Sequence, residues 1–310
     1  MEITTLISSS ILSFLLIYFT QKKFLKDKMT VKINNRSSHN VIATSNGGIA
    51  IFLNLFIISI WNYINGVTLF DYSLLIPTSI MVILGVYDDS KTVNFKLKFI
   101  FQIIVAKIII DNGFVINNLH GFIGIFELNS IIAQLFTMFI IVGIINAINF
   151  IDGIDGLALS IISLFILSFE FFIKGIPEFF NLSIILIGSF IPLFYFNYRK
   201  NNKVFLGDGG SLFLGTIVAI YTVYILSNNY VIKNTYDMNK ILFVISILAY
   251  PFIDISRVFF LRIIKGKSPF IADKNHIHHI LNSKLNKHSY TSILIFILSL
   301  LTILLFQIIF

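Results

Sequence analysis

Long apolar runs separated by short polar segments follow one another along the whole chain. A helix that crosses a bilayer needs about 20 mostly apolar residues. On this criterion the pattern predicts ten spanning segments: 3–19, 47–64, 69–87, 97–111, 130–148, 156–173, 182–197, 208–226, 240–263 and 291–310. The loops are too short for a separate soluble domain, and no internal repeat stands out. We therefore predict an all-α, polytopic integral membrane protein in which residues 1–310 form one domain.

The basic residues predict how these segments are oriented. A group of six follows the first apolar run rather than preceding it, which is not the pattern of a signal peptide: Lys22, Lys23, Lys26, Lys28, Lys32 and Arg36. By the positive-inside rule this loop is cytoplasmic and the N-terminus lies outside. With ten spans, nineteen of the 23 Lys and Arg residues fall in loops assigned to the cytoplasm and three in loops assigned outside, while Lys107 lies in a span.

Composition agrees with a membrane location and excludes other classes. Of the 310 residues, 56% are hydrophobic and 12% are charged, about half of the charged content of a typical soluble domain. This excludes a soluble enzyme, a disordered protein and a nucleic-acid binder. The net charge of +8 fits basic cytoplasmic loops, and the absence of Cys excludes disulfides and Cys-based metal sites.

Three acidic clusters are the candidates for chemistry, because carboxylates near a membrane are costly and tend to be functional. They are Gly85-Val86-Tyr87-Asp88-Asp89, the run from Asn146 to Gly156 with Asp152 and Asp155, and Phe205-Leu206-Gly207-Asp208-Gly209-Gly210-Ser211. Each alone has a structural explanation as a turn or helix cap. All three, however, fall on the predicted cytoplasmic side, where five carboxylates would repel one another unless a cation held them. Together they favour a metal or phosphate site, with oxygen ligands of the kind that Mg²⁺ prefers.

Two loops carry weaker signals. His276-Ile277-His278-His279 lies in the last predicted cytoplasmic loop and follows several basic residues in the sequence. We interpret it as a contact for phosphate or sugar, and the alternative is a solvated basic loop near anionic lipid. Arg36-Ser37-Ser38-His39, followed by Asn46-Gly47-Gly48, also has the residue types for approaching phosphate.

These motifs, in this order, resemble the polyprenyl-phosphate N-acetylhexosamine-1-phosphate transferases of glycosyltransferase family 4. The run from Asn146 to Leu157 is similar to the family pattern Asn-x-x-Asn-x-x-Asp-Gly-x-Asp-Gly-Leu at every fixed position, and the cluster at 205–211 is similar to Phe-Met-Gly-Asp-x-Gly-Ser. His276–His279 resembles the family's cytoplasmic histidine loop. The loop at 36–48 resembles the branch that primes O-antigen and other surface glycans more than the peptidoglycan branch.

The resemblance implies a reaction and its participants. A UDP-N-acetylhexosamine donates sugar-1-phosphate to a polyprenyl (undecaprenyl) phosphate at the cytoplasmic side of the inner (plasma) membrane, UMP is released, and Mg²⁺ or Mn²⁺ assists. It also implies a homodimer. By resemblance, Asp208 is the leading metal ligand, Asp89 completes or orients the metal site, and Asp88 is the base or the nucleophile of a two-step route. The implied substrate contacts are Asn149, Asp152, Asp155, Lys96, His276, His278 and His279, with Phe205 stacking on uracil.

The chain departs from the family pattern at two positions near these residues. Thr92 stands where the family often has a third acidic residue, four positions after Asp88. Asn197 lies eleven residues before Asp208 rather than ten, without the intervening prolines. A first cluster of three carboxylates is therefore not expected, and the role of Asn197 is open.

Three other functions compete with this interpretation. A phospho-N-acetylmuramoyl-pentapeptide transferase of the peptidoglycan branch shares the reaction class. An intramembrane aspartyl protease would use Tyr87-Asp88 and Gly207-Asp208, but Phe205 stands where it needs glycine, and Asp152 to Gly156 would have no role. A transporter would need ionisable residues along its spans, and here these are few: Lys107, Glu170, Asp254 and Arg257.

Overall fold

The computed structural model describes residues 2–31, 42–227, 229–233, 239–266 and 275–309. The predicted contribution of Arg36 to His39 lies outside these residues. The chain folds into two compact units, Met1–Ile109 with Gly175–Thr216 (unit 1), and Ile110–Lys174 with Ile217–Phe310 (unit 2). The interpretation of residues 1–310 as a single domain stays a prediction.

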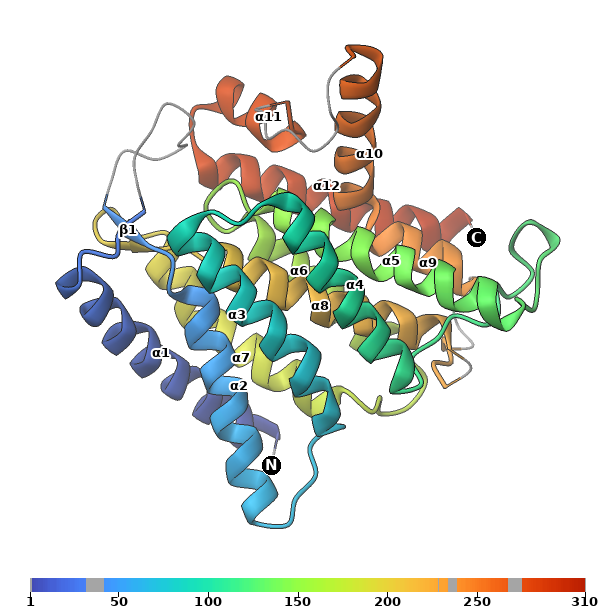
Figure 1. Cartoon of the computed structure of the whole chain (residues 1–310), viewed down its shortest axis with the longest axis horizontal. Coiled ribbons are helices and arrows are strands. Elements are labelled where there is room, and N and C mark those ends of the chain that lie inside the picture. The colour runs from blue at the N-terminus through green and yellow to red at the C-terminus, as the bar shows by residue number, and fades with distance from the viewer. Residues whose placement is uncertain (1, 32–41, 228, 234–238, 267–274, 310) are drawn as a thin grey trace. The chain divides into compact units, whose positions relative to one another are not determined.

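Unit 1 is a helical unit with one short pair of strands (Figure 1). Helix α1 packs against α7 and α2, and α2 packs in turn against α7 and α3. Strands β1 and β2 pair in parallel, with Ala43 opposite Lys203. The elements of unit 1 are α1 (Glu2–Lys26), β1 (Ala43–Thr44), α2 (Gly47–Ile64), α3 (Leu75–Lys91), most of α4 (Phe95–Asp111), α7 (Phe180–Asn197), β2 (Lys203–Val204) and the first half of α8 (Gly207–Leu226).

Buried polar side chains join the helices of unit 1. The Asn54 side-chain amide donates to the hydroxyl oxygens of Ser9 (2.8 Å) and Ser189 (2.6 Å), which connects α2 to α1 and α7. Hydrogen bonds between small polar residues hold helices together where lipid supplies no hydrophobic drive for their association. These contacts fix the scaffold from which the loops of unit 1 extend.

The starts of α2 and α8 are tied to each other through the backbone. Gly47 N–H donates to the carbonyl of Phe205 (3.0 Å) and Gly48 N–H to that of Leu206 (2.9 Å). Two amide groups at the N-terminus of α2, which have no partner inside their own helix, are satisfied in this way. The segment that carries Phe205 therefore arrives at the beginning of α8 in a fixed position, directly before Asp208.

Unit 2 is also helical. Helix α12 packs against α6, α9 and α11, while α5 packs against α6 and α10. Figure 1 shows α11 and α12 as successive helices joined by a short turn. The elements of unit 2 are α5 (Ser130–Ile151), α6 (Leu157–Phe172), the second half of α8, α9 (Lys240–Ile247), α10 (Ala249–Ile264), α11 (Ile277–Leu285) and α12 (His288–Ile309).

The helices agree with the predicted membrane class. In the described part of the chain seven helices are long and apolar enough to cross a membrane, or eight when α9 and α10 count as one span. Two further predicted segments form shorter helices, α4 with 17 residues and α6 with 16. The count of ten and the orientation stay predictions.

The segment predicted as a span over 240–263 forms two helices rather than one. Helix α9 ends at Ile247, α10 begins at Ala249, and the two are bent by 73°. Pro251 explains the break, because proline has no N–H to give to the carbonyl four residues earlier and its ring clashes with that carbonyl. The bend lets α10 leave the direction of α9 and carries Asp254 toward the histidine helix α11, which it contacts.

Candidate active site

The buried face of α3 ends in a carboxylate. Met81, Leu84, Gly85 and Asp88 are all buried, and they recur at the three- to four-residue spacing that places side chains on one face of a helix. Asp88 is only 7% exposed. The apolar face therefore directs Asp88 into the interior of unit 1, at the end of the helix.

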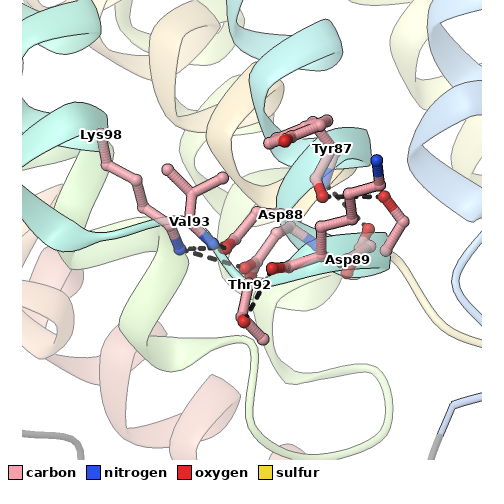
Figure 2. A network of polar contacts seen from close by, with 10 residues as sticks. Tyr87, Asp88, Asp89, Thr92, Val93 and Lys98 are labelled. Atoms are coloured by element: carbon pink, nitrogen blue, oxygen red, sulfur yellow. Dashed lines mark hydrogen bonds and ion pairs between the residues drawn. The ribbon is translucent and has the colours of Figure 1, made fainter.

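Asp88 is fully engaged by unit 1 (Figure 2). Its Oδ1 accepts a hydrogen bond of 2.5 Å from the backbone N–H of Val93, which closes the turn after α3. Its Oδ2 forms an ion pair with the ammonium group of Lys98. The same ammonium lies 3.3 Å from Oδ2 of Asp208. One lysine thus joins two of the predicted catalytic carboxylates.

Asp89 has a different partner from its neighbour. Its Oδ1 accepts from the backbone N–H of Asp208 (3.1 Å) and its Oδ2 from that of Gly209 (3.3 Å). These N–H groups belong to the first turn of α8, where amides lack partners and a negative charge is favourable. Asp89 thus caps α8 from another helix and fixes the backbone at Asp208.

Lys98, which was not predicted from the sequence, supplies the positive charge of this cluster. Lys96, for which a phosphate contact was predicted, is exposed on α4. The buried positions of α4 include Gln102, Val105 and Ile109. Lys98 extends this stripe by one turn toward the N-terminus, whereas Lys96 does not, and this periodicity was the signal that could have identified it.

The close contact of α3 with α8 depends on Gly85. A Cβ atom at this position would overlap the backbone carbonyl of Asp208 and the Cα of Gly209. Backbone atoms cannot move aside as the end of a long side chain can. The helices therefore approach closely enough for Asp89 to reach the start of α8 only because residue 85 has no side chain.

We expect Gly85→Ala to destabilise the protein by about 1–3 kcal/mol, the usual cost of overpacking, and to lower its melting temperature in detergent. Gly143→Ala in α5 is the matched control, because a Cβ there meets nothing within 4 Å. Equal melting temperatures for the two variants would contradict this account of the α3–α8 contact.

Thr92, which replaces an acidic residue of the family pattern, ends α3 in an unusual conformation. Its φ of 50° lies in the left-handed region, which β-branched residues rarely adopt. The turn is held by Asp88, whose backbone carbonyl accepts from Thr92 N–H (2.9 Å) and whose side chain accepts from Val93 N–H. The strain is therefore sustained by the same carboxylate that binds Lys98.

The donor set of unit 1 fits a magnesium ion that is shared with phosphate. Among the described residues no three His, Asp or Glu side chains are grouped to hold a metal ion. Mg²⁺, however, is often bound through one or two carboxylates together with substrate phosphates. Asp208, whose side chain is 36% exposed, is the carboxylate that can serve in this way, because both oxygens of Asp89 already accept backbone hydrogen bonds.

In unit 2 the loop between α5 and α6 is bound to residues of α12. Asp155 is buried, its Oδ2 lies 3.1 Å from Nδ1 of His288, and its carbonyl accepts from the Ser292 hydroxyl (2.7 Å). His288 and Ser292 are four residues apart and share one face of α12. Neither residue was predicted from the sequence. Asp155 is thus engaged by the protein itself, while Asn149 and Asp152 in the same segment are half-buried.

The histidine motif lies against this loop, so that two of the predicted substrate-binding segments come together within unit 2. A Cβ at Gly153 would overlap Nε2 of His278 and lie 3.3 Å from Cε1 of His279. The ring of His276 lies 5.6 Å from that of Phe150, between centroids. The glycine in the Asp-Gly-Ile-Asp-Gly run therefore makes room for the histidines.

The three histidines differ in their surroundings. His278 is completely buried, and burial, followed by the neighbouring His279, lowers its pKa to about 3. Its Nδ1 lies 3.3 Å from the Tyr250 hydroxyl. A neutral, buried imidazole is not a cation for phosphate, so this placement does not support the predicted donor contact of His278. His276 is bonded to Asp254, and His279 is half-buried.

Phe205, predicted to stack on uracil, and Asn197, whose role the sequence left open, lie at the connection from α7 to α8. Phe205 is half-buried, and its backbone N–H donates to the carbonyl of Thr44 (2.8 Å). Asn197 is buried at the end of α7, where its side-chain amide donates to the carbonyl of Val204 (2.9 Å). The open question about Asn197 thus has a structural answer, since it holds the strand that leads to Asp208.

Comparisons with known proteins agree with this arrangement of motifs. Residues 72–226 match the model of glycosyl transferase family 4, and the chain belongs to this family. The segment includes the whole of α3 and α8, with Asp88, Asp89 and Asp208.

The relatives that the chain matches are named as transferases of the same kind. The chain is similar to a probable undecaprenyl-phosphate N-acetylglucosaminyl 1-phosphate transferase of Bacillus subtilis, with 31% identity over 79% of this chain and 67% of the relative. It is also similar to the undecaprenyl-phosphate alpha-N-acetylglucosaminyl 1-phosphate transferases of Haemophilus influenzae (31% identity, 81% of this chain and 70% of the relative) and Escherichia coli K12 (28%, 90% and 76%). The predicted family is confirmed, and with it a multi-pass membrane protein.

Proposed function

We propose that the protein transfers an N-acetylhexosamine-1-phosphate, or a deoxy derivative, from a UDP-sugar to undecaprenyl or another polyprenyl phosphate. The observation that carries the proposal is the cluster of unit 1, in which Lys98 joins Asp88 to Asp208 while Asp89 caps the helix that begins at Asp208. The names of the relatives support both the lipid acceptor and the transferred group. The product, a lipid-linked diphospho-sugar, primes cell-envelope glycan synthesis at the inner membrane.

The reaction joins two polyanions, and the cluster supplies what such a reaction needs. A phosphate oxygen of the lipid attacks the β-phosphorus of the donor, the bond from that phosphorus to the bridging oxygen breaks, and UMP leaves. Lys98 places a positive charge beside Asp88 and Asp208, where phosphate charge accumulates. Asp88 keeps the lipid phosphate deprotonated; a covalent aspartyl intermediate at the same carboxylate is the two-step alternative.

Asp208 is the residue we assign to hold Mg²⁺, or Mn²⁺ in its place. When bound, the ion neutralises phosphate oxygens and polarises the phosphorus under attack. Asp89 fixes the direction of Asp208 through the first turn of α8. The helix N-terminus itself adds a partial positive charge at this position.

We assign donor recognition to the cluster of unit 2. Asn149 and Asp152 are the half-buried polar residues of the loop before α6, and His276 and His279 lie in contact with the same part of unit 2. Asp155 contributes by keeping the loop attached to α12 through His288. Phe205 and Lys96 keep their predicted contacts with uracil and phosphate as part of the proposal, as does the homodimer.

The test is transfer by the purified protein in detergent. Undecaprenyl phosphate, Mg²⁺ and a panel of labelled UDP-N-acetylhexosamines should yield UMP and one labelled lipid, and EDTA should stop the reaction until Mg²⁺ or Mn²⁺ is added back. The panel includes UDP-N-acetylmuramoyl-pentapeptide, and preference for this donor would show the peptidoglycan-branch reaction instead. If a protein with a cooperative melting transition gave no product from any donor, the proposal would be refuted.

A further inference from the structure

Asp254 is a buried carboxylate that the proposed reaction does not use. It lies on α10 with no exposed surface. Burying a carboxylate is costly unless hydrogen bonds and opposite charges satisfy it. Asp254 has such partners among the described residues: its Oδ1 accepts from Ile277 N–H (2.7 Å) and lies 3.4 Å from Nη2 of Arg257. Its Oδ2 lies 2.8 Å from Nδ1 of His276 and 3.9 Å from Nδ1 of His278.

The first of these contacts caps the histidine helix. Helix α11 begins at Ile277, and its N-cap residue His276 makes no capping hydrogen bond with its own side chain. The carboxylate of Asp254 takes this place from another helix. It satisfies an amide that would otherwise lack a partner and sets a negative charge at the positive end of α11.

The second contact fixes the state of the His276 ring. A carboxylate accepts hydrogen bonds only, so Nδ1 of His276 carries the proton that points at Asp254. Nε2 is then the nitrogen left for a ligand. The rings of Phe150 and His278, with centroids 5.6 Å from that of His276, limit its rotation. Among the described residues, the charged or titratable groups facing it include Asp254 on α10, with Arg257 bound to the same carboxylate, and His278 and His279 on α11.

We propose that Asp254 is a positioning residue for the donor: it holds His276 with Nδ1–H directed at itself, and so presents Nε2 to the phosphate or sugar of the UDP-sugar. This inference rests on the proposed function, since it needs the donor to bind at His276. In metal sites, mutating the carboxylate that orients a metal-binding histidine typically costs about 10–100-fold in metal affinity or activity.

Two substitutions separate this role from a merely structural cap. Asn is as good a helix cap as Asp, so Asp254→Asn keeps the hydrogen bond to Ile277. Its amide, however, directs N–H at Nδ1 and reverses the tautomer of His276. We expect Asp254→Asn to raise the KM for the UDP-sugar about tenfold or more, with the KM for undecaprenyl phosphate within about twofold and a smaller change in kcat. Asp254→Ala, which loses the cap as well, should also lower the melting temperature.

Three further measurements make the result decisive. In a His276→Gln background, Asp254→Asn should have no additional effect on the donor KM, because it acts through the ring that is already missing. Nitrogen NMR of the histidine-labelled protein should show protonated Nδ1 at His276 in the unsubstituted protein and protonated Nε2 in Asp254→Asn. Asp71→Asn is the control, because Asp71 also caps a helical turn (Tyr72–Leu74), through Ser73 N–H (2.9 Å), and is not among the residues assigned to the donor.

An unchanged donor KM in Asp254→Asn, with transfer by the unsubstituted protein intact, would overturn this inference and leave the proposed function standing. Additive effects in the His276→Gln background would overturn it as well. Absence of transfer by the unsubstituted protein is a different result, since it refutes the proposed function, and the NMR spectra would then still report the tautomer.

Discussion

Asp208→Asn should abolish transfer, with a loss of turnover of about 10³-fold or more. Asn has the size of Asp and can still accept a hydrogen bond at the start of α8, so the fold should survive. What is lost is the negative charge that we assign to hold Mg²⁺ and that pairs with Lys98 at 3.3 Å. The measurement is UMP release with undecaprenyl phosphate and the preferred UDP-sugar, at saturating Mg²⁺.

The control for Asp208 is another acidic residue of unit 1. Glu178 is exposed in the segment before α7, on the side of the membrane predicted to lie outside. We expect Glu178→Gln to retain full turnover. If Asp208→Asn kept more than about a tenth of the activity, the assignment of Asp208 to the metal and the phosphates would be wrong.

Lys98→Met should have the second-largest effect, a loss of about 10²-fold or more in turnover. Met keeps the length of the side chain but removes its charge. Asp88 and Asp208 then face each other without a counter-charge, and a buried carboxylate loses its ionic partner. We expect both slower transfer and a lower melting temperature.

Two other lysines show whether the effect belongs to Lys98. Lys200 is exposed in the turn after α7, and Lys200→Met should behave as the unsubstituted protein. Lys96→Met compares the residue selected from the resemblance with the residue that the structure places at the carboxylates. A larger loss of activity for Lys96→Met than for Lys98→Met would return the role to Lys96.

The helical class of the protein could be predicted because lipid imposes long apolar segments. Hydropathy averaged over about twenty residues does not reveal the break at Leu248. Both α9 and α10 are apolar, so the mean hydropathy over 240–263 stays high. Pro251 was the local signal for this break. Its consequence, that Asp254 leaves the direction of α9 and reaches α11, depends on tertiary structure and has no counterpart in the hydropathy pattern.

The acidic residues of the candidate site could be named from the sequence, but their different tasks could not. Asp88 and Asp89 are adjacent and chemically alike. They differ because one continues the buried face of α3 whereas the other meets amides that lie 119 and 120 residues further along the chain. Lys98 was missed for a related reason. Its position is set by the buried face of α4, whereas Lys96 was selected from the resemblance to the family pattern.

The adjacency of Asp88 and Asp89 has a consequence for how the site can change. Successive residues of an α-helix are about 100° apart around its axis, so the rotation of α3 sets the direction of both carboxylates at once. A rotation that withdrew Asp89 from the amides of α8 would also withdraw Asp88 from Lys98. The capping of α8 and the ion pair with Lys98 therefore depend on the same rotation of α3, and we expect an inserted or deleted residue between Gly85 and Asp89 to break both.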